Sequence, residues 1–130
     1  MAGARHELEA MARAAGGTGA LLTGRDGMLI EATMERQRAE ALSALVAASF
    51  GAAGELGAEL PELAMPEELV IEADKGTLYV TPAGPARLLA LLSGPSGNLG
   101  VIRLEMRQAA ARLSDDNDQD PAGAVSDALT

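Results

Sequence analysis

The chain has 130 residues, enough for one domain with a modest core, and 48% of them are apolar, which excludes a wholly disordered protein. It contains no cysteine and a single histidine, so disulfides, cysteine nucleophiles and metal sites built from these two residue types are excluded. The net charge of −9 includes five aspartates after Arg112, and subtracting their −5 leaves −4 for residues 1–113. Because an acidic chain without a basic stripe repels phosphate, we expect neither nucleic acid nor an anionic membrane as a partner.

The N-terminal residues show no signal-peptide pattern, because charges interrupt them at Arg5, Glu7, Glu9 and Arg13. The longest uncharged runs, 41–54 and 88–102, hold 14 and 15 residues, fewer than the roughly 20 that span a bilayer. We therefore expect a cytoplasmic protein with no membrane insertion.

A helix and a β-hairpin are the first expected elements. Residues 3–15 place apolar side chains at helical spacing among charges, and Gly16-Gly17 ends this helix. The apolar runs Gly19–Gly24 and Met28–Thr33 follow, on either side of the turn Arg25-Asp26-Gly27. An Asp-Gly pair between two such runs predicts a hairpin, since Gly accepts a positive φ without steric cost.

The pattern becomes helical again from about Gln37 to Leu60. An apolar stripe at steps of three and four predicts the side of this helix that packs on the core. The stripe consists of Leu42, Leu45, Val46, Ser49, Ala53, Leu56 and Leu60. A second, alanine-rich face carries Ala41, Ala44, Ala48 and Ala52. Two explanations of this face stay open: small side chains let a second helix approach closely, or alanine is present only as the best helix former.

A second hairpin and a central strand are expected after the prolines at 61 and 66. The runs Glu68–Ala73 and Thr77–Thr81 are joined by the turn Asp74-Lys75-Gly76, which predicts the hairpin. The run Leu88–Leu92 is entirely apolar. Such a run is typical of a strand that is covered on both faces, so we expect it at the centre of the sheet.

The last expected helix begins after Asn98, a favourable N-cap residue. Its apolar stripe consists of Leu99, Ile102, Met106, Ala109, Ala110 and Leu113. Residues 114–130 are acidic and have little to bury, so they are predicted to form a disordered tail behind a single domain over 1–113. The order α-β-β-α-β-β-β-α predicts the α+β class, with helices packed on a five-stranded antiparallel sheet.

No group of residues supports catalysis. His6 lies near the terminus between two charged residues, as a solvated helix residue does. The loop Gly94–Gly100 stands between a strand and a helix, as phosphate-binding loops do, but its G-x-x-G-x-x-G spacing lacks a following Lys-Ser/Thr. The aspartates at 115–120 lack the Gly and the final Glu of a calcium loop. We expect no metal, no cofactor and no enzymatic activity.

Three segments resemble bacterial members of the roadblock (dynein light chain) family. They are Ser96–Leu113, in which Asn-Leu-Gly leads into an Arg/Glu/Ala helix, the hairpin Gly19–Ile30, and Lys75–Val80, which carries Tyr79. The agreement lies in order and spacing over about 7–113, and it is similar to the gliding-motility regulators that act on a partner GTPase. The resemblance implies a profilin-like roadblock fold and a homodimeric, non-catalytic platform that binds and regulates a small Ras-like GTPase.

The resemblance also implies site residues. Family members pair their third strands and pack their second helices on each other. This implies a dimer interface formed by Ala41, Leu45, Ala48, Ala52, Leu69, Val70, Ile71 and Glu72. The paired helices present a surface to the GTPase, which implies contacts from Gln37, Arg38, Ser43 and Ala44. The gliding-type regulators reposition residues of the GTPase, so no arginine finger is assigned.

Two other function classes stay open. A small-molecule sensor of profilin, PAS or GAF-like layout needs a cavity beneath the sheet, and bulky aliphatic side chains with almost no aromatic rings argue against one. An assembly adaptor that is indifferent to the nucleotide differs from a regulator only in leaving the GTPase cycle unchanged.

Overall fold

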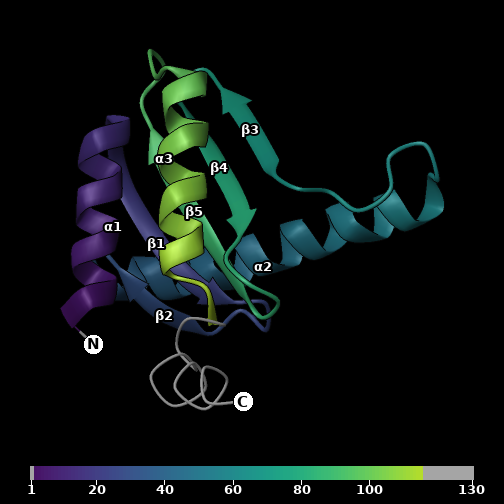
Figure 1. Cartoon of the computed structure of the whole chain (residues 1–130), viewed down its shortest axis with the longest axis horizontal. Coiled ribbons are helices and arrows are strands. Elements are labelled where there is room, and N and C mark those ends of the chain that lie inside the picture. Colours follow the sequence, from purple (N-terminus) through teal and green to yellow (C-terminus); the bar gives the residue numbers. More distant parts are fainter. Residues whose placement is uncertain (1, 116–130) are drawn as a thin grey trace, which may run out of the picture.

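Eight elements follow one another in the expected order in the computed structural model, which describes residues 2–115 (Figure 1). They are α1 (Ala2–Ala15), β1 (Gly17–Gly24), β2 (Leu29–Ala32), α2 (Arg36–Glu59), β3 (Leu69–Ala73), β4 (Gly76–Pro82), β5 (Arg87–Ser93) and α3 (Leu99–Arg112). Most of the tail predicted for 114–130 lies outside the described residues. Its first residue, Ser114, is buried against the domain.

The five strands form one antiparallel sheet in the order β2-β1-β5-β4-β3. The central position predicted for Leu88–Leu92 is confirmed: β5 is the middle strand, and Leu88 to Leu91 are buried. In the β1–β2 turn the Asp26 carboxylate accepts the Met28 N–H at 3.0 Å, and Gly27 has φ +88°. A Cβ on Gly27 would lie 3.3 Å from the Ala44 Cα, so the turn also needs glycine to approach α2.

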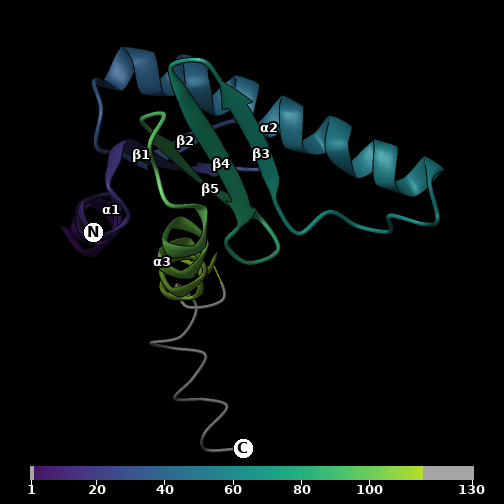
Figure 2. The same ribbon diagram turned by 90° about the horizontal axis from the view of Figure 1, so that it is seen from above.

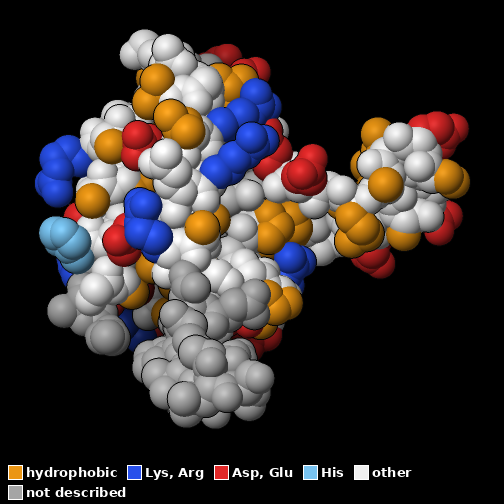
Figure 3. All heavy atoms as spheres, in the orientation of Figure 1, with side chains coloured by type: hydrophobic (Ala, Val, Ile, Leu, Met, Phe, Trp, Pro, Cys, Tyr) orange, Lys and Arg blue, Asp and Glu red, His pale blue; other side chains and the backbone are white. Residues whose placement is uncertain are grey.

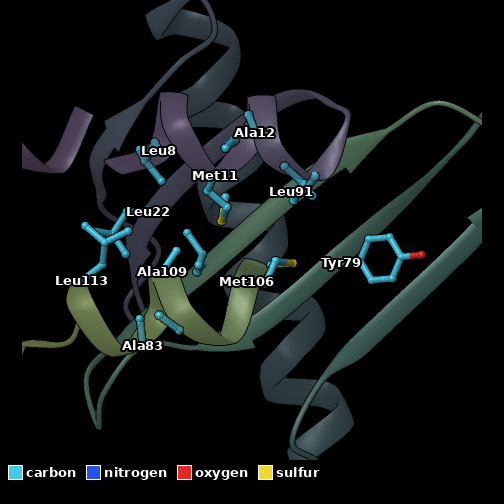
Figure 4. Close-up of a cluster of buried hydrophobic side chains, with 14 of the residues drawn as sticks. Leu8, Met11, Ala12, Leu22, Tyr79, Ala83, Leu91, Met106, Ala109 and Leu113 are labelled. Atoms are coloured by element: carbon cyan, nitrogen blue, oxygen red, sulfur yellow. The ribbon is translucent and has the colours of Figure 1, made fainter. Parts of the chain in front are cut away.

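Helices α1 and α3 cover one face of the sheet, and α2 lies on the other (Figure 2). The larger core lies under α1 and α3, where Leu8 and Met11 of α1 meet Leu22, Leu91 and the apolar stripe of α3 (Figure 4). Its buried members are Leu8, Met11, Ala12, Ala15, Ala20, Leu22, Tyr79, Ala83, Leu89, Leu91, Ile102, Met106, Ala109, Ala110 and Leu113. The α3 stripe predicted from the sequence is thus confirmed, as is the cap, because Asn98 Oδ1 accepts the Val101 N–H at 3.1 Å.

The core under α2 corrects the stripe predicted for that helix. The buried residues of α2 are Ala39, Ser43, Val46, Phe50 and Gly57. Of the predicted stripe only Val46 is buried, and Leu45, Leu56 and Leu60 are 63%, 56% and 41% exposed. The helix is rotated because close packing against the hairpin and the following loop needs small residues. A Cβ on Gly57 would lie 2.2 Å from the Ala64 carbonyl oxygen.

The C-terminal half of α2 projects beyond the β3 edge of the sheet (Figures 1 and 2). The helix packs on β1 and β2 through its first half, and after Phe50 its one buried residue is Gly57. The domain therefore presents a long helix that its own sheet covers along only part of its length.

Candidate interaction surface

One side of α2 carries uncovered apolar residues, which we call the leucine side. It consists of Leu42, Leu45, Leu56 and Leu60, with the polar Ser49 between them. At 100° per residue these positions lie beside the buried stripe of the helix, on one flank of it. Leu42 is half-buried, and the other four are exposed. A monomer rarely leaves so many large apolar side chains together in water, so this side is a candidate interaction surface.

An apolar hollow of about 170 Å³ adjoins the leucine side. Leu42 and Val46 of α2 line it together with Leu78 of β4 and Leu92 of β5. Arg38 also lines the hollow, and its side chain is in no ion pair among residues 2–115. The sheet is thus exposed next to the helix, which extends the apolar surface from α2 onto the strands.

Strand β3 forms one edge of the sheet, so the outer backbone groups of its five residues have no strand partner among the described residues. Side chains alternate along it. Leu69 packs toward the α2 core and Val70 toward the α1/α3 core, which places Ile71 on the α2 face and Glu72 on the other. Ile71 is 45% exposed. An apolar edge strand without Lys or Pro is a template for pairing with another strand.

Apart from the Glu35 carboxylate, which caps the helix by accepting the N–H groups of Gln37 and Arg38, the end charges of α2 are arranged against its own dipole. Arg36 and Arg38 lie in the first turn, whereas Glu55 and Glu59 lie near the C-terminus. A helix dipole favours the opposite arrangement. From Glu55 to Asp74 the chain has seven carboxylates and no Lys or Arg, and the projecting end of α2 shows acidic but no basic side chains (Figure 3). The basic and acidic ends of α2 therefore complement each other in an antiparallel pair of helices.

The outward face of α2, away from the sheet, carries the alanine-rich positions. Ala41, Ala44, Ala48 and Ala52 are all exposed, as are Gln37 and Arg38 in the first turns. Ser43 is different, because its side chain is fully buried. The expectation that Ser43 lies on the surface is therefore wrong, and a partner protein cannot reach it directly. A serine is more often found at the surface than in the core, but position 43 follows Ala39 by one turn on the buried stripe.

By length and composition, α2 is the one helix in residues 2–115 that is long and apolar enough to cross a membrane. Only 22% of its most apolar stretch is buried inside the fold. The helix nevertheless packs on the sheet through Val46 and Phe50, and the Arg25 guanidinium lies 5.5 Å from the Phe50 ring centre. Its apolar composition therefore reflects one side packed on the sheet and another that is uncovered.

An ion pair joins the start of β3 to α3. The Arg103 guanidinium donates from Nε to Glu68 Oε2 at 2.7 Å and from Nη2 at 2.5 Å. The hydrogen bond to Glu68 raises the pKa of Arg103.

Tyr79 lies near this ion pair, and burial of its ring raises its pKa above the ordinary 10.0. The carboxylates of Glu72 and Glu68 raise the pKa of Tyr79 further, whereas the positive charge of Arg103 lowers it by a smaller amount. In residues 2–115 no group of three or more His, Asp or Glu side chains is placed to hold a metal ion.

Comparison with known proteins gives one family. The model of the Roadblock/LC7 domain matches residues 6–93. Among curated proteins, the uncharacterized protein MJ1340 of Methanocaldococcus jannaschii is 32% identical over 96 residues, which cover 73% of this chain and 82% of that protein.

Solved structures show the same fold. A structure of MglB with tetrameric arrangement is 29% identical, with a TM-score of 0.79 over 88% of this chain and 87% of that one. Gliding protein MglB from Thermus thermophilus is 28% identical, with a TM-score of 0.76 over 86% of each chain. Profilin IA of Acanthamoeba castellanii, 14% identical, shares the fold alone, with a TM-score of 0.56 over 87% of this chain and 98% of that one. The profilin-like layout expected from the sequence is thus confirmed.

Proposed function

The chain belongs to the Roadblock/LC7 domain family, and from this premise we propose that it is a cytoplasmic, homodimeric and non-catalytic platform that binds and regulates a small Ras-like GTPase. The single observation that carries the proposal is the uncovered apolar surface formed by the leucine side of α2, its hollow and the open edge of β3. This surface needs a partner, and a second copy of the same chain supplies both a strand for the edge and a helix for the leucine side.

The geometry of α2 supports self-association. The helix projects past β3, so pairing of two β3 edges would bring each projecting half over the sheet of the other copy (Figure 2). Leu56 and Leu60 would then face the hollow lined by Leu42, Leu78 and Leu92 of the other subunit. The tetrameric arrangement of the similar MglB, at 29% identity, also supports self-association.

Charge supports an antiparallel arrangement of the two helices. Arg38 of one copy would approach the acidic end of α2 in the other copy, which offsets its unfavourable placement on the dipole of its own helix, whereas Arg36 is already paired with Glu40 of its own helix. Such exposed pairs contribute less to affinity than the apolar contact, roughly 0–1 kcal/mol each, but they select the orientation.

The outward face of the paired helices is proposed as the GTPase-binding surface. Gln37 and Ala44 remain its candidate contacts, and the neighbouring Ala41 and Ala48 leave it flat enough for a partner to approach closely. Arg38 lines the hollow and belongs with the dimer side instead. Ala52 lies next to the leucine side, of which Leu45 is a member, and both belong with the dimer contact. This division assigns different flanks of one helix to the two partners.

The alternative functions have less support. The apolar hollow, at about 170 Å³, is smaller than the roughly 300–1,000 Å³ typical of ligand pockets. A larger hollow of about 460 Å³ beside Arg107 of α3 is open and mostly polar, so neither is the enclosed apolar pocket that a small-molecule sensor needs. An adaptor that is indifferent to the nucleotide uses the same surfaces, so only a functional assay separates it from a regulator.

The test uses the purified small Ras-like GTPases of the source organism, each loaded with GDP or with a non-hydrolysable GTP analogue. Binding should depend on the nucleotide, and the full chain should change the rate of GTP hydrolysis or of nucleotide exchange. Binding that ignores the nucleotide and leaves both rates unchanged would leave an adaptor. Failure to bind any of these GTPases would remove the proposed partner.

A further inference from the structure

The turn after β3 decides which backbone groups of this edge strand face outward. Ala73 pairs with Gly76 across the two turn residues at 74 and 75, and the pairing runs back to Leu69 without a shift. The pair that closes a two-residue hairpin exchanges both of its backbone hydrogen bonds, and such pairs alternate with non-hydrogen-bonded ones along the ladder. Residues 69, 71 and 73 therefore direct their backbone groups toward β4, whereas Val70 and Glu72 direct theirs outward.

These outward groups allow only a few registers for a second β3 strand. The inference rests on the proposed function, which places a second copy at this edge. A two-fold axis perpendicular to the sheet makes the paired strands antiparallel and keeps both α2 helices on the same face. Because a hydrogen-bonded pair needs outward groups on both strands, the axis passes through a residue position. Within the middle of β3 this position is Val70, Ile71 or Glu72.

The length of β3 favours Ile71. With the axis at Ile71, all five residues 69–73 pair with the same five of the other copy in reverse order. With the axis at Val70 or at Glu72, only the residues 69–71 or 71–73 find a partner within the strand. The axis at Ile71 also pairs Val70 with Glu72 of the other copy twice, which uses every outward backbone group of the strand.

Charge favours the same register. The axis at Glu72 would put its two copies directly opposite each other, and the axis at Val70 would put Glu72 opposite Glu68 of the other copy. Like charges in directly opposite positions of a sheet destabilise the pairing. With the axis at Ile71, the residue opposite Glu72 is the uncharged Val70.

This register brings two carboxylates near each other only beyond the ends of the strands. Glu68 of one copy would approach Asp74 of the other there. Glu68 already accepts a hydrogen bond from Arg103 at 2.7 Å, and the exposed Lys75 follows Asp74 in the turn. Both carboxylates thus have a cation beside them.

We propose that two copies pair their β3 strands with the two-fold axis at Ile71. Ile71 then meets Ile71 of the other copy on the α2 face, which covers a side chain that is 45% exposed in the single chain. The register also fixes the offset of the two α2 helices. Moving the axis by one residue shifts one subunit against the other by two residues, about 6.6–6.8 Å, and displaces each projecting helix from the hollow of the other copy.

The absence of cysteine allows a direct test by disulfide cross-linking in the full chain. Directly opposite residues of a non-hydrogen-bonded pair have Cα atoms about 4.5 Å apart, within the roughly 4.4–6.8 Å that a disulfide needs, whereas diagonal neighbours lie about 7–8 Å apart. With oxidised glutathione, Ile71→Cys should therefore form a covalent dimer at least about tenfold faster than Val70→Cys or Glu72→Cys alone, because only its two thiols face each other.

A second measurement reads the register with Ile71 unaltered. Val70→Cys and Glu72→Cys chains, co-expressed so that mixed dimers form, should cross-link with each other although neither does so alone. In the proposed register these two positions form a facing, hydrogen-bonded pair with Cα atoms about 5.5 Å apart.

The native mass of the unaltered chain and of the reduced variants separates the register from the dimer itself. Dimers in which Val70→Cys or Glu72→Cys alone cross-links faster than Ile71→Cys would move the axis and overturn the register, while the proposed dimer would stand. Equal rates for all three variants would indicate a ladder without a fixed register, and dimers that cross-link at none of these positions would indicate an interface elsewhere. Either result overturns the proposal. A monomeric unaltered chain would overturn the register and the proposed dimer together.

Discussion

The Ser43 hydroxyl is the one buried side-chain polar atom without a hydrogen-bond partner among the described residues. Removing a buried, unsatisfied hydroxyl recovers its desolvation cost, and alanine is also the better helix former. We predict that Ser43→Ala raises the free energy of unfolding by about 1–2 kcal/mol in urea denaturation at fixed protein concentration. The matched control is Ala39→Ser, one turn earlier on the same buried stripe. This substitution should lower the free energy of unfolding by about 1–3 kcal/mol, because it buries a hydroxyl without a partner. A loss of stability in Ser43→Ala would mean that the hydroxyl has a partner.

Tyr79 allows a second prediction at this scale, because it is the only tyrosine and the chain has no tryptophan. Burial and the carboxylates of Glu72 and Glu68 raise the pKa of Tyr79 in the folded state above 10.0. The unfolded chain then loses the phenol proton first, so this group destabilises the fold as the pH rises above about 10. Absorbance at alkaline pH should give a higher midpoint in buffer than in urea.

The control for this effect is Tyr79→Phe. Its stability should decline less between pH 9 and 10.5 than that of the unaltered chain. Equal midpoints in buffer and in urea, together with equal decline in both proteins, would contradict the assigned environment of Tyr79.

At the scale of elements, the order of helices and strands could be predicted because each boundary has a local chemical signal. Asp26-Gly27 and the turn at 74–76 mark the two hairpins, Asn98 marks the start of α3, and the apolar run of β5 marks its central place. These signals depend on neighbouring residues only, so a single sequence contains them.

The orientation of α2 could not be predicted in the same way. Its leucines form the more hydrophobic stripe, and apolar side chains that face a partner look the same in sequence as those that face the core. The buried stripe contains Ala39, Ser43 and Gly57, whose small size is explained only by the approach of the β1–β2 turn and of the loop after α2.

The division of α2 into two flanks predicts different effects for neighbouring substitutions. Leu45→Asp places a charge on the leucine side and should weaken self-association roughly a hundredfold or more, because the carboxylate is buried without a partner. Ala44→Asp changes the preceding residue, which lies about 100° around the helix from Leu45. It should leave the native mass unchanged and reduce GTPase binding. Sedimentation of both variants gives the mass. A dimeric Leu45→Asp or a monomeric Ala44→Asp would contradict the assignment of the flanks.

At the scale of the whole molecule, the sheet separates two surfaces of different chemistry. On one side lie the apolar flank of α2 and the open β3 edge, and on the other lie α3 and the hollow beside Arg107. The resemblance implied the first surface in outline, because it named β3 and the second helix, but the alanine-rich face lies on another side of α2. The second depends on contacts between segments far apart in the chain, such as Ala86 with Asp115, which no local pattern encodes.

The central claim is that the leucine side of α2 and the β3 edge are covered by a second copy of the chain. The native mass in solution, measured by light scattering after size-exclusion chromatography at micromolar concentration, tests it most directly. We predict twice the 13.2 kDa of a single chain. A mass of 13.2 kDa that persists as the concentration is raised would contradict the claim.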